Sequence, residues 1–590
     1  MKRNVLLSGC ILCCLLAVCS PVKRSRDQIR NVIVLIPDGC GIAHMTVARW
    51  FKGRPLAHDS MDVGLVRTWC ANSMITGSAA SATAFSTGHK TIESADIARA
   101  LGMVPDSHFV PAPQELPPGQ HWRPAATVLE AAKAAGKAVG LIATSRITHA
   151  TPAAYASHWH SRYNDNIIMK QMVYQNIPVV FGGGMRYLVD SAASVPGFPS
   201  STGKREDGEN LHDILLEKGY TLISTARELE KLDSAARKVW GAFAANHMKH
   251  DIDRKEFGPE EPSLEQMTGA AIEILSKDPD GFFLVVEGSQ VDWSSHDNDP
   301  VGVVSDYLAF DKAVETALDF ARKDRRTAVM VFPDHDNGGM SLGWHKLDYD
   351  YFTPDSMTGV IQKARLTAAG VSNILMKNID RFNPDISAIK KIVSEHFGLA
   401  DISNRELLEI AAEFADTLKR DYEGNLRLDS LGNPVVDTNN INLRRIIGPL
   451  LSKRAGIGWT TYGHTGNDVP LFSFGLPGPV HTIDNTEIAS LCAGALNVNL
   501  DSASSHLFCD AGELFDGLDI SIDTLDVHAG RGAIAVTGTG RNAVFPFFTN
   551  ICISGKDTVE FDGLALYSLK ADKAFLPRDA VRAFNELAMH

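Results

Sequence analysis

The sequence predicts an α/β protein with a mostly parallel central sheet, followed by a small β-rich C-terminal extension. Along most of the chain, apolar runs alternate with alanine-rich segments of helical periodicity, a pattern typical of parallel sheets covered by helices. After about Asp501 the pattern changes to short alternating segments separated by Gly and Asn turns. We therefore expect a main domain over residues 28–500 and an extension over residues 501–590.

Four apolar runs are the clearest candidates for buried strands, because strands covered on both faces read as continuous Val, Ile and Leu runs. They are Asn31–Asp38, Ala138–Ala143, Phe282–Val286 and Ala328–Phe332. The helical pattern is clearest at Ala125–Ala135, Leu264–Ser276, Asp306–Ala321 and Ser387–His396. In the extension, strand alternation is clearest at Ile520–Asp523, Ala533–Thr537 and Val559–Phe561.

Residues 1–20 have the pattern of an export signal. Lys2 and Arg3 precede an apolar run from Val5 to Val18 that is too short to span a bilayer. The segment ending at Cys19 loosely resembles a lipoprotein processing box. A soluble periplasmic form and a form lipid-anchored to the cell envelope both fit this segment, and no later stretch has a transmembrane pattern.

Composition excludes several classes of protein. The chain has 590 residues, is 44% hydrophobic and carries a net charge of −13, so we expect a globular protein without nucleic acid as a dedicated partner. The cysteines beyond the signal form no C-x-x-C pair, which argues against a zinc ribbon or a dense disulfide framework and favours buried free thiols. They are Cys40, Cys70, Cys492, Cys509 and Cys552.

Polar residues follow three of the expected strands at the point where each strand ends. Asp38 closes the first run, Glu287 the third, and Asp334-His335 follows the fourth. Carboxyl ends of strands in an open α/β sheet meet at the edge where sites form. Any one of these acids alone could instead cap a helix or pair with an arginine. Three together favour a metal centre.

A second group of candidate ligands lies just after Glu287. Asp292 and His296 are four residues apart, so they share one face if the chain turns helical after Gly288, and one metal ion can then bind both. His464 stands in the Gly-flanked turn Gly463–Asp468. By itself a histidine in such a turn is more often an ordinary loop residue than a ligand.

The segment Thr76–Gly88 is built from small residues and predicts a tightly packed helix. Ser78 would lie in its first turn, where free N–H groups and the helix dipole favour an anion. A Ser-capped core helix is the plain alternative. A serine becomes a nucleophile when a base or a metal activates it, and the metal ligands elsewhere in the chain therefore favour a catalytic Ser78.

Five motifs, in chain order from about residue 30 to 500, resemble the alkaline phosphatase family. They are Thr76–Ala84, His149–Ala154, Glu287–His296, Asp334–Gly339 and Gly463–Gly466. The resemblance implies a three-layer α/β sandwich, two zinc ions and one magnesium ion. It also implies hydrolysis of phosphate monoesters through a phosphoserine, and it suggests a homodimer.

The same resemblance implies a role for each matching residue. The ligands of the first zinc would be Asp292, His296 and His464. Those of the second would be Asp38, Asp334 and His335, with Ser78 joining them as an alkoxide. The magnesium ligands would be Glu287, Thr151 and the other oxygen of Asp38. The guanidinium of Arg162 would form a bidentate hydrogen bond to the phosphate oxygens, a geometry that lysine cannot reproduce.

Three positions depart from the best-known members of that family. Gly77 stands where those members have an aspartate that orients the arginine, so we expect a more mobile Arg162 and weaker phosphate binding, which Gly77→Asp would reverse. His149 and Trp293, expected on the substrate side, resemble the branch with histidine and tryptophan at these positions. His149 would reach the third metal through a water or hydrogen-bond to a neighbouring carboxylate.

Other functions are compatible with parts of this pattern. A phosphodiesterase or a sulfatase of the same superfamily would use a similar metal-binding site. The sulfatase motif Cys-x-Pro-x-Arg, however, is absent from the sequence. A catalytically silent metal or phosphate binder would retain the fold without turnover. The presence of every expected ligand favours the enzyme.

Overall fold

The structure is a computed structural model that describes residues 29–93, 102–104, 121–193, 195, 203–345, 353–381, 383–416, 441–538 and 540–587. The expected export signal, residues 1–20, lies outside these ranges. Among the described residues, no helix is both long enough and apolar enough to cross a membrane. The five cysteines beyond residue 20 are free thiols, and all except the partly exposed Cys509 are buried.

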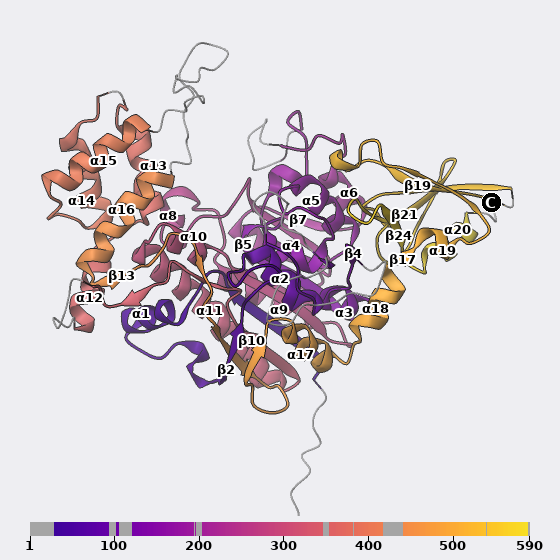
Figure 1. Cartoon of the computed structure of the whole chain (residues 1–590), viewed down its shortest axis with the longest axis horizontal. Coiled ribbons are helices and arrows are strands. Elements are labelled where there is room, and N and C mark those ends of the chain that lie inside the picture. Colours follow the sequence, from indigo (N-terminus) through magenta and orange to yellow (C-terminus); the bar gives the residue numbers. More distant parts are fainter. Residues whose placement is uncertain are drawn as a thin grey trace, which may run out of the picture.

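A ten-stranded sheet forms the centre of the molecule, in the order β16-β2-β15-β10-β1-β9-β5-β6-β8-β7 (Figure 1). Within this sheet, β15 runs against its neighbours, being antiparallel to both β10 and β2. The four predicted strands are confirmed as β1 (Asn31–Pro37), β5 (Ala138–Arg146), β9 (Phe282–Gly288) and β10 (Thr327–Val331). The others are β2 (Asp62–Arg67), β6 (Val179–Gly183), β7 (Thr221–Ile223), β8 (Val239–Ala244), β15 (Val469–Phe474) and β16 (Thr482–Asp484).

Helices cover both faces of this sheet, which makes the fold a three-layer sandwich. Along β1, Val32 and Val34 belong to one core and Ile33 and Leu35 to the other, because successive side chains of a strand point to opposite faces. The first core includes α2 (Ser78–Thr87), α3 (Val128–Ala134), α4 (Ala150–Ala156) and α17 (Glu487–Leu496). The second includes α1 (Ile42–Lys52), α9 (Leu264–Leu275) and α11 (Pro300–Asp324).

Capping explains where two predicted helices begin. Helix α3 starts after Thr127, whose hydroxyl accepts from the backbone N–H of Glu130 while the Glu130 side chain accepts from the N–H of Thr127. Helix α11 starts earlier than expected, because the Asp299 carboxylate caps the Val301 N–H and Pro300 occupies the first turn.

Two regions extend the sandwich at opposite ends of the molecule (Figure 1). A helical region with its own apolar core contains α12 (Pro354–Ile361), α13 (Ala368–Asn378), α14 (Ile386–Phe397), α15 (Asn404–Asp416) and α16 (Ile441–Arg454). Of these, only α14 is foreseen from the sequence. The β-rich extension is confirmed at the other end as an antiparallel sheet of β18 (Asp519–Asp523), β19 (Ala533–Gly538), β20 (Arg541–Pro546), β21 (Ile551–Ser554) and β22 (Asp557–Glu560).

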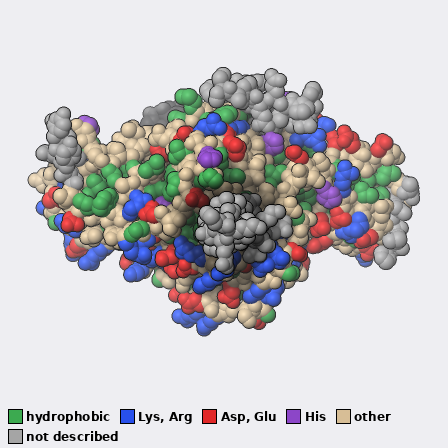
Figure 2. All heavy atoms as spheres, turned by 90° about the horizontal axis from the view of Figure 1, so that it is seen from below, with side chains coloured by type: hydrophobic (Ala, Val, Ile, Leu, Met, Phe, Trp, Pro, Cys, Tyr) green, Lys and Arg blue, Asp and Glu red, His purple; other side chains and the backbone are tan. Residues whose placement is uncertain are grey.

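The extension shares the first core of the sandwich. Phe548 packs edge-on against Trp159, with ring centroids 5.3 Å apart, and the Ser568 hydroxyl donates to the Trp122 carbonyl. On the face drawn in Figure 2, acidic and basic side chains of the described residues are interspersed rather than gathered by sign.

A buried ion pair joins α11 to the segment between β8 and α8 (Arg254–Phe257), and its contribution to stability should depend on pH. Burial lowers the pKa of His250, but the Asp306 carboxylate, 2.6 Å from Nδ1, together with the smaller effects of Asp253 and Asp299, raises that pKa to about 9. The unfolded value is about 6.5. The pair should therefore contribute about 3 kcal/mol below pH 6.5, and this contribution should be lost as pH rises through 9.

We expect Asp306→Asn to lower the Tm markedly at pH 6 and much less at pH 10, as followed by thermal unfolding. The control is Asp213→Asn, which removes the partner of His212 at the surface and should leave Tm unchanged at both pH values. An equal loss of Tm at pH 6 and pH 10 for Asp306→Asn would contradict the charge-based explanation.

Candidate metal centre

The acids predicted from strand ends do meet at one edge of the sheet. Strands β10, β1 and β9 are adjacent and parallel, and Glu287 of β9 pairs in register with Ile36 of β1. Asp38 follows β1 and Asp334 follows β10. Potential ligand atoms gather here in three clusters, each with all its atoms within 4.8 Å of one another.

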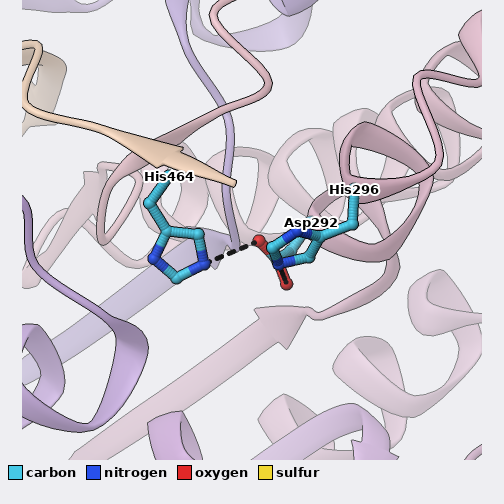
Figure 3. A group of neighbouring side chains, drawn as sticks. All are labelled: Asp292, His296 and His464. Carbon is cyan, nitrogen blue, oxygen red and sulfur yellow. Dashed lines mark ion pairs between the residues drawn. The ribbon is translucent and has the colours of Figure 1, made fainter. Parts of the chain in front are cut away.

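The first cluster consists of Asp292, His296 and His464 (Figure 3). Asp292 and His296 come from α10 (Gln290–His296), so the helical spacing expected from the sequence is present. Their side chains converge, with His296 Nε2 lying 3.5 Å from Asp292 Oδ2 and His464 Nε2 3.7 Å from Asp292 Oδ1. A cation between them would be reached by two nitrogens and a carboxylate, a zinc-type donor set.

Backbone carbonyls orient both of these imidazoles. His296 Nδ1 donates to the carbonyl of Tyr462 at 2.6 Å, and His464 Nδ1 donates to that of Thr76 at 2.9 Å. A carbonyl only accepts, so Nδ1 of each ring carries a proton, and Nε2 is the nitrogen turned toward Asp292, where it could bind a cation. This arrangement is typical of metal-ligating histidines.

The second cluster consists of Asp38, Asp292 and His335, and the expected ligand Asp334 lies beside it rather than among its three members. His335 Nε2 lies 3.2 Å from Asp334 Oδ2 and 3.6 Å from Asp38 Oδ1. The backbone N–H groups of Gly39 and His335 both donate to Asp334 Oδ1 at 3.0 Å, which turns Oδ2 toward the cluster. Asp292, expected only in the first cluster, also lies within reach of Asp38 and His335, so it stands between the two.

The third cluster contains Asp38, Glu287 and His149. The Ser145 hydroxyl donates to one oxygen of Glu287 at 3.3 Å. His149 occupies the N-cap position of α4, and the buried Thr151 lies in the first turn of that helix, next to Glu287. Asp38 therefore belongs to two clusters, as the family resemblance implies. His149 has a ring nitrogen within reach of both acids.

The electrostatics of these acids fit bound cations. Burial first, and then the neighbouring Asp334 and Asp292, raise the pKa of Asp38 well above its ordinary value. Burial and Asp292 raise the pKa of Asp334 to about 7. Several buried atoms have no hydrogen-bond partner among the described residues: both carboxylate oxygens of Asp38, Asp334 Oδ2, Glu287 Oε1 and Thr151 Oγ1. Carboxylate and hydroxyl oxygens suit magnesium, and the imidazole-containing clusters suit zinc.

The second-cluster histidine is held neutral, as a metal ligand must be. Burial, followed by the nearby His464 and His296, lowers the pKa of His335 well below its ordinary value. Burial and then Arg162 do the same for the pKa of His149. The structure thus provides unprotonated imidazoles beside buried acids, which is the arrangement a cation completes.

Ser78 is the first residue of α2 and is 3% exposed. Its Oγ lies 3.3 Å from His335 Nε2. The Ser81 hydroxyl donates to the Asp334 carbonyl at 2.7 Å, which anchors the first turn of α2 to the loop that bears the ligands. The serine is therefore presented to the second cluster from a helix N-terminus, where an anion is also favoured.

The expected phosphate-binding arginine lies beside the third cluster. Arg162 is 8% exposed, and its Nη2 donates to His149 Nε2 at 2.9 Å. Trp293 packs edge-on against His149 and His247, with ring centroids 5.9 Å and 4.5 Å away. His149, Arg162 and Trp293 are thus brought together around one side of the centre.

Sequence reasoning missed two residues that support the ligands. Asn337 Nδ2 donates to the Oδ1 of Asp292 at 2.7 Å and to its carbonyl at 2.9 Å. Asn337 lies two residues after His335, within one of the motifs that carry the expected ligands, and this position could have indicated a supporting role. His247 follows the carboxyl end of β8, the same sheet edge, and accepts from Arg146 Nη1 at 2.8 Å.

Comparisons with known proteins agree with this architecture. The sequence profile of the alkaline phosphatase family matches residues 29–498. Alkaline phosphatase 3 of Bacillus subtilis is 34% identical over 495 residues, which cover 81% of this chain and 91% of that protein. The repressible alkaline phosphatase of Saccharomyces cerevisiae is 30% identical over a match that covers 82% of this chain and 84% of that protein.

Solved structures show the same likeness. The alkaline phosphatase of Thermus thermophilus superimposes with a TM-score of 0.65 at 25% identity, over 80% of this chain and 92% of that one. A cold-active alkaline phosphatase from Shewanella gives a TM-score of 0.61 at 25% identity, and the match covers 79% of this chain and 99% of that one. The chain belongs to the alkaline phosphatase family, whose members are metal-dependent phosphoric monoester hydrolases.

Proposed function

We propose that this protein hydrolyses phosphate monoesters through a covalent phosphoserine at Ser78. The observation that carries the proposal is the 3.3 Å approach of Ser78 Oγ to His335 Nε2, at the edge of a cluster of metal-ligand type. A serine hydroxyl placed there lies where a metal can activate it as a nucleophile.

The three clusters would hold two zinc ions and one magnesium ion. The first zinc would be bound by Asp292, His296 and His464, and the second by Asp38, Asp334 and His335. The magnesium would be bound by Asp38, Glu287 and Thr151, with His149 beside them. When bound, these ions supply the positive charge that a phosphate dianion and its attacking and leaving oxygens require.

The residues of the chain then perform two successive displacements. The Ser78 oxygen bonds to phosphorus as the bond to the alcohol oxygen breaks, and the alcohol leaves. Water next displaces Ser78 and releases inorganic phosphate, which restores the hydroxyl. The N-terminal N–H groups of α2 and the guanidinium of Arg162 bind the phosphate oxygens during both steps.

Metal content measured together with substrate preference tests this function. The parent protein, loaded with zinc and magnesium, should hydrolyse a nitrophenyl phosphate monoester far faster than the corresponding diester. A preference for the diester would indicate a phosphodiesterase instead. Bound metal with no turnover of either substrate would indicate a silent binder.

Asn337 should matter for zinc retention even though it is not a ligand. Asn337→Ala removes both hydrogen bonds to Asp292, and loss of such an orienting partner typically weakens metal binding about 10–100-fold. Competition against a zinc chelator would measure this. The control is Asn378→Ala on α13, where the exposed amide bonds only its own helix. Equal zinc affinity in both variants would contradict the orienting role.

A further inference from the structure

Helix α16 of the helical region lies directly against the backbone that follows the expected ligand His296. A Cβ placed on Gly448 of α16 would lie 2.3 Å from the Asp297 carbonyl oxygen, closer than a real Cβ contact allows. Glycine at this position therefore permits the close approach of the two backbones. Further along α16, the Ser452 hydroxyl donates to the Asn298 carbonyl at 2.9 Å. The helical region is thus docked on the segment that continues from the first metal cluster.

Arg445 of the same helix contacts His296 itself. Its Nε donates to the His296 carbonyl at 3.3 Å, and its guanidinium lies over the ring of Tyr462, 5.1 Å from the ring centroid. The Tyr462 carbonyl in turn accepts from His296 Nδ1 at 2.6 Å. Arg445 therefore contacts both the backbone of His296 and the residue that orients its imidazole.

A proline inside α16 explains why Tyr462 also bonds to this helix. Pro449 has no N–H, so it cannot donate to the carbonyl of Arg445, four residues earlier. The Tyr462 hydroxyl donates to that carbonyl instead, at 3.4 Å. Tyr462 precedes the second histidine of the cluster, His464, by two residues. The contact with α16 therefore also restrains the chain that leads into His464.

We propose that Arg445 and Tyr462 are positioning residues for the first metal cluster, through which α16 holds His296 in its ligating orientation. The inference rests on the proposed function, because it requires a cation bound by Asp292, His296 and His464. It gives the helical region a role in metal retention. By linkage, zinc bound at the cluster should stabilise the docking of α16 to the same extent that docking strengthens zinc binding.

The first test measures how easily zinc is lost. Arg445→Met keeps a long apolar side chain but removes the charge and the donor. In this variant one zinc ion per chain should pass to a competing chelator about tenfold more readily than in the parent, as is typical when a partner that orients a ligand is lost. Tyr462→Phe removes only the hydroxyl and should weaken the same zinc about fivefold.

Arg454→Ala, on the same helix, is the matched control. The Arg454 guanidinium pairs with Asp401 and Glu406 inside the helical region, so its loss should leave zinc affinity within about twofold of the parent. Equal weakening in Arg454→Ala and Arg445→Met would overturn the inference, because the effect would then reflect only the stability of the region. Parental zinc affinity in both Arg445→Met and Tyr462→Phe would overturn it as well.

The second test measures the reciprocal effect by amide hydrogen exchange. Zinc added to the metal-free parent should slow exchange in α16 about tenfold, and Arg445→Met should abolish most of this slowing. Exchange in α16 that does not respond to zinc in the parent would contradict the inference. Neither test depends on turnover, so both judge Arg445 and Tyr462 even if activity assays reject the phosphoserine mechanism.

Discussion

Replacing Ser78 by alanine is expected to lower monoester turnover by about a thousandfold or more, which corresponds to ~4 kcal/mol of transition-state stabilisation. The reason is the position of Oγ, which α2 presents at its first residue, 3.3 Å from His335 Nε2. Alanine suits a helix and leaves the ligands of all three clusters in place. Zinc and magnesium contents should therefore match the parent.

A serine at the other end of α2 gives the matched control. Ser86 is also buried, and its hydroxyl donates to the Ala154 carbonyl, away from the metal clusters. Ser86→Ala should retain turnover within about threefold of the parent, apart from a stability loss of ~1 kcal/mol. Parental turnover in Ser78→Ala, or equal loss in both variants, would show that Ser78 is not the nucleophile.

Replacing Asp38 by asparagine should weaken metal binding at two clusters at once. Asp38 is fully buried, belongs to two of the three clusters, and neither of its oxygens has a hydrogen-bond partner within the described ranges. The asparagine side chain would offer one neutral oxygen in place of a bridging carboxylate, so both the second zinc and the magnesium should be weakened. We expect turnover to fall at least about a thousandfold, with metal per chain measured by elemental analysis.

The same substitution should have opposite effects on stability with and without metal. In metal-free protein it removes one of several buried acids that repel one another, the repulsion that contributes to the raised pKa of Asp38. Its Tm should therefore rise or stay level there, and should fall in the metal-loaded protein. Asp319→Asn, on the exposed face of α11, should change neither. A lower Tm in the metal-free Asp38→Asn protein would contradict the metal-bridging role.

Local sequence patterns were enough to predict the central strands and to single out most of the residues that meet in the three clusters. The strands β1, β5, β9 and β10 are covered on both faces, so their runs are continuous and apolar, and the acids at their ends stand out. The i, i+4 spacing of Asp292 and His296 is likewise a local signal, because both lie on α10.

What the sequence could not reveal depends on pairings between distant segments. β15 is only recognisable as the antiparallel strand once it lies between β10 and β2. Asp292 serves two clusters because β1 and α10 meet at one edge, which spacing within either segment does not encode. The Glu93 carboxylate fills the space over Gly77 only through the path of the loop after α2.

The most direct test of the phosphoserine mechanism is to trap the intermediate. The metal-loaded protein would be mixed with a phosphate monoester, quenched in acid and digested, and the phosphorylated residue located by peptide mass spectrometry. The mechanism predicts phosphate on Ser78 in the parent and none in Ser78→Ala. Phosphate on another residue, or steady turnover with no phosphorylated peptide at any quench time, would contradict it.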